Sequence, residues 1–329
     1  MYNGTPHAQA SAYEIIQNRP MPPSLRTQWI TQLLADEPPR SKSLITTIFG
    51  DAIVPHGGVA WLGSLIELLM PFGVNERLLR TSVFRLAQEG WVGAEREGRR
   101  SSYAITPEAM TRFARAERRI YAPPLAQWDG NWTLVIGAAS TLDPVARSAL
   151  RKQLQWEGYY MLAPGLAAHP QSDPDLLKAI LHRTGMADKV YVCRATGLPG
   201  VGGKALTELV AQGWDLTGVA QGYRHFIAQF APLKTLLVDE PAVDAEQAFV
   251  MRTLLIHAYR RVQLHDPQLP AQLLPANWPG TAAYALTREL YRVLWLASEQ
   301  HVLTTLRKEA PLTSEANSAF YARLGGLKS

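Results

Sequence analysis

The chain has 329 residues, enough for two or three domains at roughly 100–200 residues each. Hydrophobic residues make up 47% and charged residues 19%, which excludes wholesale disorder, and the single cysteine excludes an intrachain disulfide and a cysteine-rich metal site. No apolar run approaches the roughly 18 residues of a membrane span, and the N-terminus lacks the pattern of a secretory signal, so we expect a cytoplasmic protein without membrane contact.

The net charge of +5 is too small to indicate nucleic-acid binding by itself, but the basic residues are 25 arginines and only 8 lysines. The planar guanidinium suits phosphates and guanine edges, although GC-rich coding also favours arginine. Residues 75–120 hold 10 basic and 6 acidic side chains, so this stretch contributes +4 of the net charge. A nucleic-acid contact is therefore expected in this part of the chain.

The first 40 residues hold six prolines, which predicts an arm with one short helix. Ser24 is a suitable N-cap, and Leu25, Trp29 and Leu33 follow at helical spacing until Pro38 ends the pattern. An amphipathic helix of this kind is expected to pack on its own domain or on a partner subunit.

Residues 41–122 predict a winged helix-turn-helix domain. Three helical patterns are followed by two β-like runs around a glycine turn, and then by a charged helix that ends at Pro123 and Pro124. Asn75 is a good N-cap for the third helix, and Gly90 is a good end for it. The predicted segments are the helices 41–55, 61–73 and 75–90, the hairpin 91–106 and the helix 106–122.

The third helix has the two faces that a recognition helix needs. On a wheel of about 100° per residue, Leu79, Val83 and Leu86 fall within about 60° of one another and form an apolar seam. The opposite face carries side chains that hydrogen-bond base edges and phosphates. These are Arg77, Thr81, Arg85 and Gln88, with Arg80 on the flank.

The hairpin tip places further arginines around Gly98, where a wing meets phosphates or the minor groove. Two other interpretations remain open: an ordinary solvated helix and hairpin, or a winged helix that contacts protein. The predicted DNA contacts are Arg77, Arg80, Thr81, Ser82, Arg85, Arg96, Arg99 and Arg100.

The rest of the chain predicts two further domains, so the fold class is α+β and multidomain. Residues 123–198 have the β-α-β-β-α-β order of a ferredoxin-like fold, with Asp143 as one helix cap and Ser172 or Asp173 as the other. Residues 199–329 predict a helical domain interrupted by a proline-rich loop at 265–280. The glycine-rich stretch 197–204 lacks the spacing of a phosphate-binding loop and is interpreted as a linker.

The sequence resembles the phenylacetate-degradation repressor (PaaX-like) family over about residues 41–300. The resemblance is carried by SLITTIFGDAIVPHGGVAWLGSLIELLMPFGVNERLLRTSVFRLAQEGWVGAEREGRRSSYAIT and by WDGNWTLVI, GYYMLAPGLAAHP, WDLTGVAQGYRHFIAQF and MRTLLIHAYRRVQLHDPQLPAQLLPANWPG. It implies a winged-helix repressor of phenylacetate catabolic genes, released from double-stranded operator DNA by phenylacetyl-coenzyme A. It also implies that the central domain is similar in fold to the CRISPR-associated Cas2 proteins.

An effector of that kind needs basic groups for its phosphates and an apolar pocket for its phenyl ring. The predicted effector contacts are His257, Arg260, Arg261, Trp278 and Tyr160. Alternatively, the two arginines pair with carboxylates such as Asp266 or Glu289. The aromatic cluster of the central domain, which includes Trp156, then serves mainly in packing.

Two enzyme classes are the alternatives to a repressor. A metal-dependent nuclease in the central domain needs carboxylates at a strand end, and Asp143 is better interpreted as a helix cap. A thioester hydrolase needs an activated nucleophile, but Cys193 has no evident base and the sequence has no Gly-x-Ser-x-Gly elbow. We therefore expect a homodimeric, non-enzymatic DNA-binding regulator without a metal or cofactor.

Overall fold

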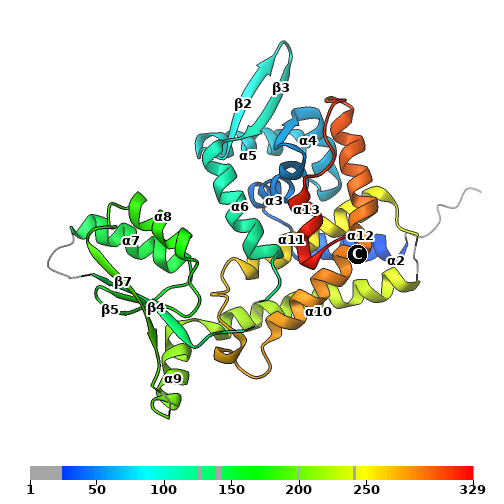
Figure 1. Cartoon of the computed structure of the whole chain (residues 1–329). Coiled ribbons are helices and arrows are strands. Elements are labelled where there is room, and N and C mark those ends of the chain that lie inside the picture. Colours follow the sequence, from blue (N-terminus) through cyan, green and yellow to red (C-terminus); the bar gives the residue numbers. More distant parts are fainter. Residues whose placement is uncertain (1–23, 125–126, 138–142, 199, 240–241, 329) are drawn as a thin grey trace, which may run out of the picture.

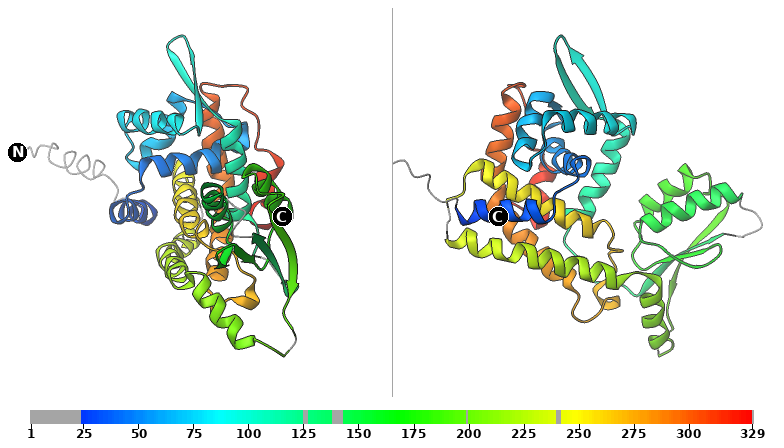
Figure 2. Two further views of the ribbon diagram at one scale, coloured as in Figure 1. Left: turned by 90° about the vertical axis from the view of Figure 1, so that its left-hand side faces the viewer. Right: turned by 180° about the vertical axis from the view of Figure 1, so that it is seen from behind.

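The computed structural model describes residues 24–124, 127–137, 143–198, 200–239 and 242–328, so most of the predicted N-terminal arm lies outside the described residues. The arm helix α2 (Leu25–Asp36) is present, and Ser24 Oγ accepts from Thr27 N at 3.2 Å as predicted. Trp29 meets the Phe230 ring edge-on at 5.5 Å, so the helix packs on its own chain. Figure 2 shows α2, in dark blue, alongside the C-terminal helices.

The N-terminal unit contains the predicted three helices, hairpin and following helix, with one short strand that the sequence analysis missed. The first helix does not run evenly to Pro55, because it passes into a π-helical turn at Phe49–Ile53. The elements are α3 (Ser41–Ile48), β1 (Val59–Trp61), α4 (Leu62–Leu69), α5 (Glu76–Gln88), β2 (Val92–Glu97), β3 (Arg100–Ile105) and α6 (Pro107–Tyr121).

The three strands of this unit form one antiparallel sheet in the order β1-β3-β2. Strand β1 pairs with the C-terminal half of β3, from Val59 opposite Ala104 to Trp61 opposite Ser102. The outer halves of β2 and β3 pair only with each other and end at Gly98, whose φ of 60° suits a glycine in the turn. The hairpin therefore projects from the body, as Figure 1 shows.

The central unit has the predicted β-α-β-β-α-β order and the antiparallel strand order β5-β6-β4-β7. Asp143 accepts from Ala146 N at 3.0 Å, and Asp173, rather than Ser172, caps the second helix. Both helices pack against the buried face of the sheet around Val135, Leu154 and Ile180. The elements are β4 (Asn131–Gly137), α7 (Pro144–Trp156), β5 (Tyr160–Ala163), β6 (Leu166–His169), α8 (Pro174–Arg183) and β7 (Val190–Thr196).

The C-terminal unit is helical, as predicted, and its second helix continues through Pro232 to Asp239. The loop before the longest helix contains only a short 3-10 turn at Ala271–Leu273. The elements are α9 (Gly203–Gly213), α10 (Leu216–Asp239), α11 (Ala245–Gln263), α12 (Pro279–Arg307) and α13 (Ser318–Ala322).

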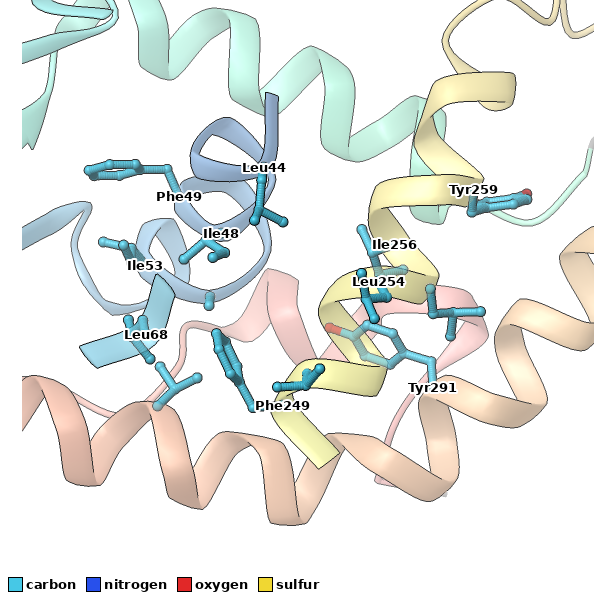
Figure 3. Packing of buried hydrophobic residues seen from close by; sticks show 14 of the residues in the cluster. Leu44, Ile48, Phe49, Ile53, Leu68, Phe249, Leu254, Ile256, Tyr259 and Tyr291 are labelled. Atoms are coloured by element: carbon cyan, nitrogen blue, oxygen red, sulfur yellow. The ribbon is translucent and has the colours of Figure 1, made fainter. Parts of the chain in front are cut away.

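The N-terminal and C-terminal units bury one common hydrophobic core. Figure 3 shows side chains of the N-terminal unit, such as Leu44 and Ile48, beside Phe249, Leu254 and Tyr291 of the C-terminal helices. All of these residues are almost fully buried. The central unit has a core of its own. Two units that the central unit separates in the sequence therefore form one body, and the central unit is attached to its side (Figure 1).

A buried charge network ties the two halves of this body together. The Asp51 carboxylate accepts from Tyr121 Oη at 2.6 Å and from Tyr291 Oη at 3.0 Å. Arg323 Nη1 donates to the same oxygen at 3.1 Å, and Arg252 Nε lies 3.0 Å from the other. These charges lie almost out of contact with water, so each depends on its partners.

Candidate nucleic-acid interface

Helix α5 is held in the body by one face. Its apolar seam of Leu79, Val83 and Leu86 is buried, as predicted. Asn75 Oδ1 accepts from Leu78 N at 2.9 Å at the first turn, and Gly90, with a φ of 72°, ends the last turn. The opposite face is therefore presented outward in a fixed orientation.

The outward face of α5 carries the predicted polar side chains, because Arg77, Thr81, Arg85 and Gln88 are all exposed. Arg77 and Arg85 make no side-chain hydrogen bond or ion pair with any residue that the structure describes. Thr81 Oγ1 donates to the Arg77 carbonyl at 3.0 Å and keeps its lone pairs exposed. Two unpaired guanidiniums on a rigid helix make this face a binding surface for anions or hydrogen-bond acceptors.

Two of the residues of α5 predicted to contact DNA, Arg80 and Ser82, are not unpaired side chains of the outward face. The Arg80 guanidinium is 2.6 Å from Glu76 one turn earlier, which neutralises part of its charge. Ser82 is only 6% exposed, because it lies on the side of the helix that packs on the body. The prediction that Ser82 contacts DNA is therefore wrong for this conformation.

Two apolar residues also lie on this surface, and neither was predicted from the sequence to do so. Phe84 is 62% exposed and Leu78 is 42% exposed, although both are large and apolar. On the same wheel Phe84 falls about 140° from Leu79, in the outward arc between Arg80 and Arg77. An apolar side chain there can contact a thymine methyl group. The helical spacing of Phe84 was therefore enough to predict its place on the outward face.

The three arginines near the hairpin tip differ in the contacts that their side chains make. Arg99 lies in the turn, exposed, and has no side-chain partner among the described residues. Arg96 is also exposed, and its Nε donates to the Gly98 carbonyl at 3.2 Å.

Arg100 points back toward the body instead. Its guanidinium lies 4.3 Å from the centroid of the Trp61 ring and donates to the Glu309 carbonyl at 3.1 Å. Glu309, just after α12, also accepts from Ser64 N at 3.1 Å, near the start of α4. Arg100 therefore ties the turn end of β3 to the C-terminal unit through its side chain, whereas Arg99 in the turn has no such contact among the described residues.

Of the five residues predicted to hold an effector, the structure brings His257 and Arg260 together and places the other three elsewhere. His257 Nδ1 and Arg260 Nη1 each lie 2.8 Å from Thr47 Oγ1 of α3, and burial lowers the pKa of His257 to about 4. Arg261, on the exposed side of the same helix, lies 3.8 Å from Glu37. Asp266 and Glu289, the predicted alternative partners of these two arginines, contact other residues. Asp266 accepts from Tyr223, and Glu289 pairs with Lys234.

The two aromatic candidates belong to another cluster. Tyr160 packs at 5.4 Å from the Trp214 ring, and Trp278 meets Tyr223 edge-on at 6.0 Å. Both border the small apolar cluster around Trp214 and Leu269, between the central unit and α9. Helical spacing grouped residues on one helix but did not give the distance to residues on other elements.

One of the five, Arg260, lines a large cleft of about 1110 Å³. The cleft is bounded by α3 and α6 of the N-terminal unit, by α11, and by α7 and α8 of the central unit. Its lining therefore combines residues of the body with Gln153, Trp156 and Arg183 of the central unit.

Comparison with known proteins identifies the family. Three family models match in order: "PaaX-like protein" over residues 40–109, "PaaX protein central Cas2-like domain" over 125–210 and "PaaX-like protein C-terminal domain" over 214–304. The transcriptional repressor PaaX of Escherichia coli (strain K12) is 38% identical over 297 residues, which cover 88% of this chain and 92% of that protein. The chain belongs to the PaaX-like family.

Membership in the PaaX-like family confirms the resemblance and the Cas2-like central unit that the sequence predicted. Among solved structures, the uncharacterized protein Rv0674 from Mycobacterium tuberculosis matches with a TM-score of 0.49 and 23% identity, over 79% of this chain and 97% of that one. In the described part of the chain, no helix is long and apolar enough to cross a membrane, and no three potential metal ligands form a group.

Proposed function

We propose that this PaaX-like protein is a DNA-binding transcriptional repressor in which residues 41–122 form a winged helix-turn-helix. In this arrangement α5 enters a major groove and the β2–β3 tip is the wing. The order helix, strand, helix, helix, hairpin and the sheet order β1-β3-β2 support it. The similarity to a protein named as the E. coli repressor PaaX supports the repressor role rather than an enzymatic one.

The observation that carries the proposal is the outward face of α5, where Arg77 and Arg85 have no partner in the described part of the chain. A major groove about 12 Å wide admits a helix and offers guanine acceptors to arginine. Gln88 pairs with adenine in the same way, and Phe84 contacts a thymine methyl group. Arg99 at the hairpin tip meets phosphates.

The family resemblance supports a proposal for the target genes and the effector. We propose that the protein represses phenylacetate catabolic genes and that phenylacetyl-coenzyme A releases it. A single short helix reads only a few base pairs, so we further propose a homodimer on a two-fold-related operator. Sedimentation of the free protein and of its DNA complex measures that assembly state.

The test of DNA reading compares two arginine substitutions. Operator duplexes are selected from a random library with the wild-type protein, and affinities are then measured by mobility shift. Arg85→Ala is expected to lose about 1–3 kcal/mol if Arg85 contacts a base edge. Arg224→Ala, the same change on the exposed side of α10, is the matched control and is expected to bind normally. Equal operator affinity of both variants would contradict the assignment of α5.

The effector proposal has its own readout on the same preparation. Phenylacetyl-coenzyme A is expected to release the operator, whereas free phenylacetate is not, because it lacks the phosphates. A thioester-cleavage assay run in parallel is expected to show no turnover. Release by the free acid at the same concentration would refute a phosphate-binding effector site.

A further inference from the structure

The cleft between the central unit and the body has a lining with an excess of positive charge. Seven basic and four acidic side chains border it. Three of the four acidic groups are already paired, since Glu89 contacts Lys42, Glu117 contacts Arg323, and Asp51 belongs to the buried network. Because Lys42 of the same lining is the partner of Glu89, the unmatched positive charge of the cleft lies mainly on its arginines.

Most of the arginines of the cleft have no carboxylate partner. Arg183 Nη2 donates to the neutral amide of Gln153 at 2.8 Å, and Arg260 Nη1 donates to the Thr47 hydroxyl. Arg119 Nη2 donates to the Asp266 carbonyl at 2.6 Å, while its buried Nε has no hydrogen-bond partner among the described residues. Within the described chain, no carboxylate lies at ion-pair distance from Arg40, Arg112, Arg119, Arg183 or Arg260.

The same cleft has an aromatic and apolar wall. Trp91 and Phe113 meet edge-on at 5.6 Å on the side of the N-terminal unit, and Ile256 and Leu264 of the α11 segment also line it. On the opposite side Trp156 is 56% exposed, which leaves most of an indole ring available to a ligand. Unpaired arginines together with exposed aromatic surface suit a ligand that has both anionic groups and an apolar group.

We propose that this cleft is the effector site and that it binds an acyl-coenzyme A thioester. The phosphates contact the unpaired arginines, and the acyl group and the adenine ring lie against the aromatic wall. The cleft's volume of about 1110 Å³ exceeds the range of about 300–1,000 Å³ that is usual for ligand pockets, as a nucleotide-sized ligand requires. This inference rests on the proposed release by phenylacetyl-coenzyme A, and it moves the effector away from Tyr160 and Trp278.

The location explains how a ligand reaches the DNA-binding elements. The Arg112 guanidinium lies 5.1 Å from the centroid of the Trp91 ring, and Trp91 is the last of the three residues that connect α5 to β2. Its carbonyl accepts from Thr106 N, where the hairpin passes into α6. A ligand that contacts both α6 and the central unit changes the distance between these two parts. Through Trp91, this change displaces the segment that connects α5 to the hairpin. Two states that differ in this distance then differ in affinity for DNA.

The test uses two variants on the central-unit side of the cleft and one control. Arg183→Gln removes an unpaired charge and Trp156→Ala removes the exposed ring, and both positions are accessible enough to be changed without opening a core. Arg151→Gln makes the same charge change on the exposed side of α7, outside the cleft. Binding of phenylacetyl-coenzyme A, coenzyme A and phenylacetate to the free protein is measured by calorimetry, and operator binding is measured separately for every variant.

Both cleft variants are expected to bind phenylacetyl-coenzyme A about tenfold more weakly, because each loses one charge-assisted or stacking contact. Arg183→Gln is also expected to weaken the binding of coenzyme A. The control is expected to match the wild type. Unchanged binding in both cleft variants, or no binding of the thioester to the wild type, would overturn the inference even if the protein still binds operator DNA. Failure to bind DNA while the cleft variants lose the ligand would instead refute the repressor proposal and leave the site standing.

Discussion

The N-terminal unit makes two very different junctions in this molecule. Toward the C-terminal helices it shares one hydrophobic core and the Asp51 network, whose charges lie almost out of contact with water. Toward the central unit it is separated by a cleft and joined by polar contacts such as Arg115–Glu157 at 2.8 Å. The outward face of α5 is therefore held by a buried core toward one neighbour and only by polar contacts around a cleft toward the other.

The tight junction also reaches the hairpin. Arg100 and Ser64 both contact Glu309, so the end of α12 is connected to β3 and to α4. Gly63 fits there because a Cβ atom would lie 2.8 Å from Glu309 Oε1. The C-terminal helices therefore support the orientation of α4, α5 and the hairpin rather than forming a separate domain.

The largest effect is expected from breaking the tight junction with Asp51→Asn. The change leaves Arg252 and Arg323 buried with less negative charge, and the loss in unfolding free energy is expected to be about 3–5 kcal/mol. Chemical denaturation followed by tryptophan fluorescence measures it. Glu89→Gln, which breaks the exposed pair with Lys42, is the control and should cost less than about 1 kcal/mol. Equal effects of the two changes would contradict the description of Asp51 as the centre of a buried network.

A pH titration tests the same junction with an intermediate effect. Burial, and then the charges of Arg260 and Arg261, lower the pKa of His257 to about 4, against an ordinary value near 6.5. As the pH falls, the His257 imidazole therefore takes up its proton at a higher pH in the unfolded chain than in the folded one. The stabilising contribution of neutral His257 is complete above about pH 6.5 and is lost as the pH falls toward 4.

At pH 5 the loss from His257 is expected to be about 2 kcal/mol relative to pH 7.5. Denaturation of the wild type and of His257→Gln at both pH values measures it, because the variant lacks this proton. The slope between pH 5 and 7.5 should be smaller in the variant. An identical slope in the two proteins would show that His257 is not held neutral at the contact with Thr47.

The smallest effect is expected at the loose junction. Glu157→Gln removes the carboxylate that pairs with Arg115, but the amide oxygen of glutamine still accepts from that guanidinium, so exchanging a charge-assisted hydrogen bond for a neutral one should cost about 1 kcal/mol. Hydrogen exchange is expected to rise in α7 and β5 and to stay unchanged in α3 and α11. Faster exchange throughout the body would show that the two junctions are not independent.

The sequence alone determined the local features of this protein. Leu79, Val83 and Leu86 specified the buried side of α5, because helical periodicity assigns residues to faces without reference to the rest of the fold. Caps at Ser24, Asn75 and Asp143 specified helix starts for the same local reason. Long runs of family sequence then identified the family.

Only the tertiary structure decided which of these faces meet. The common core of the first and third units, the pairing of Arg100 with Glu309 and the cleft beside Arg260 join residues from distant parts of the chain. The periodicity of a helix assigns its residues to faces but does not give the distances to residues of other elements. Those distances depend on how the units pack together. The same reason separates Arg260, which lines the cleft, from Tyr160 and Trp278, which belong to another cluster.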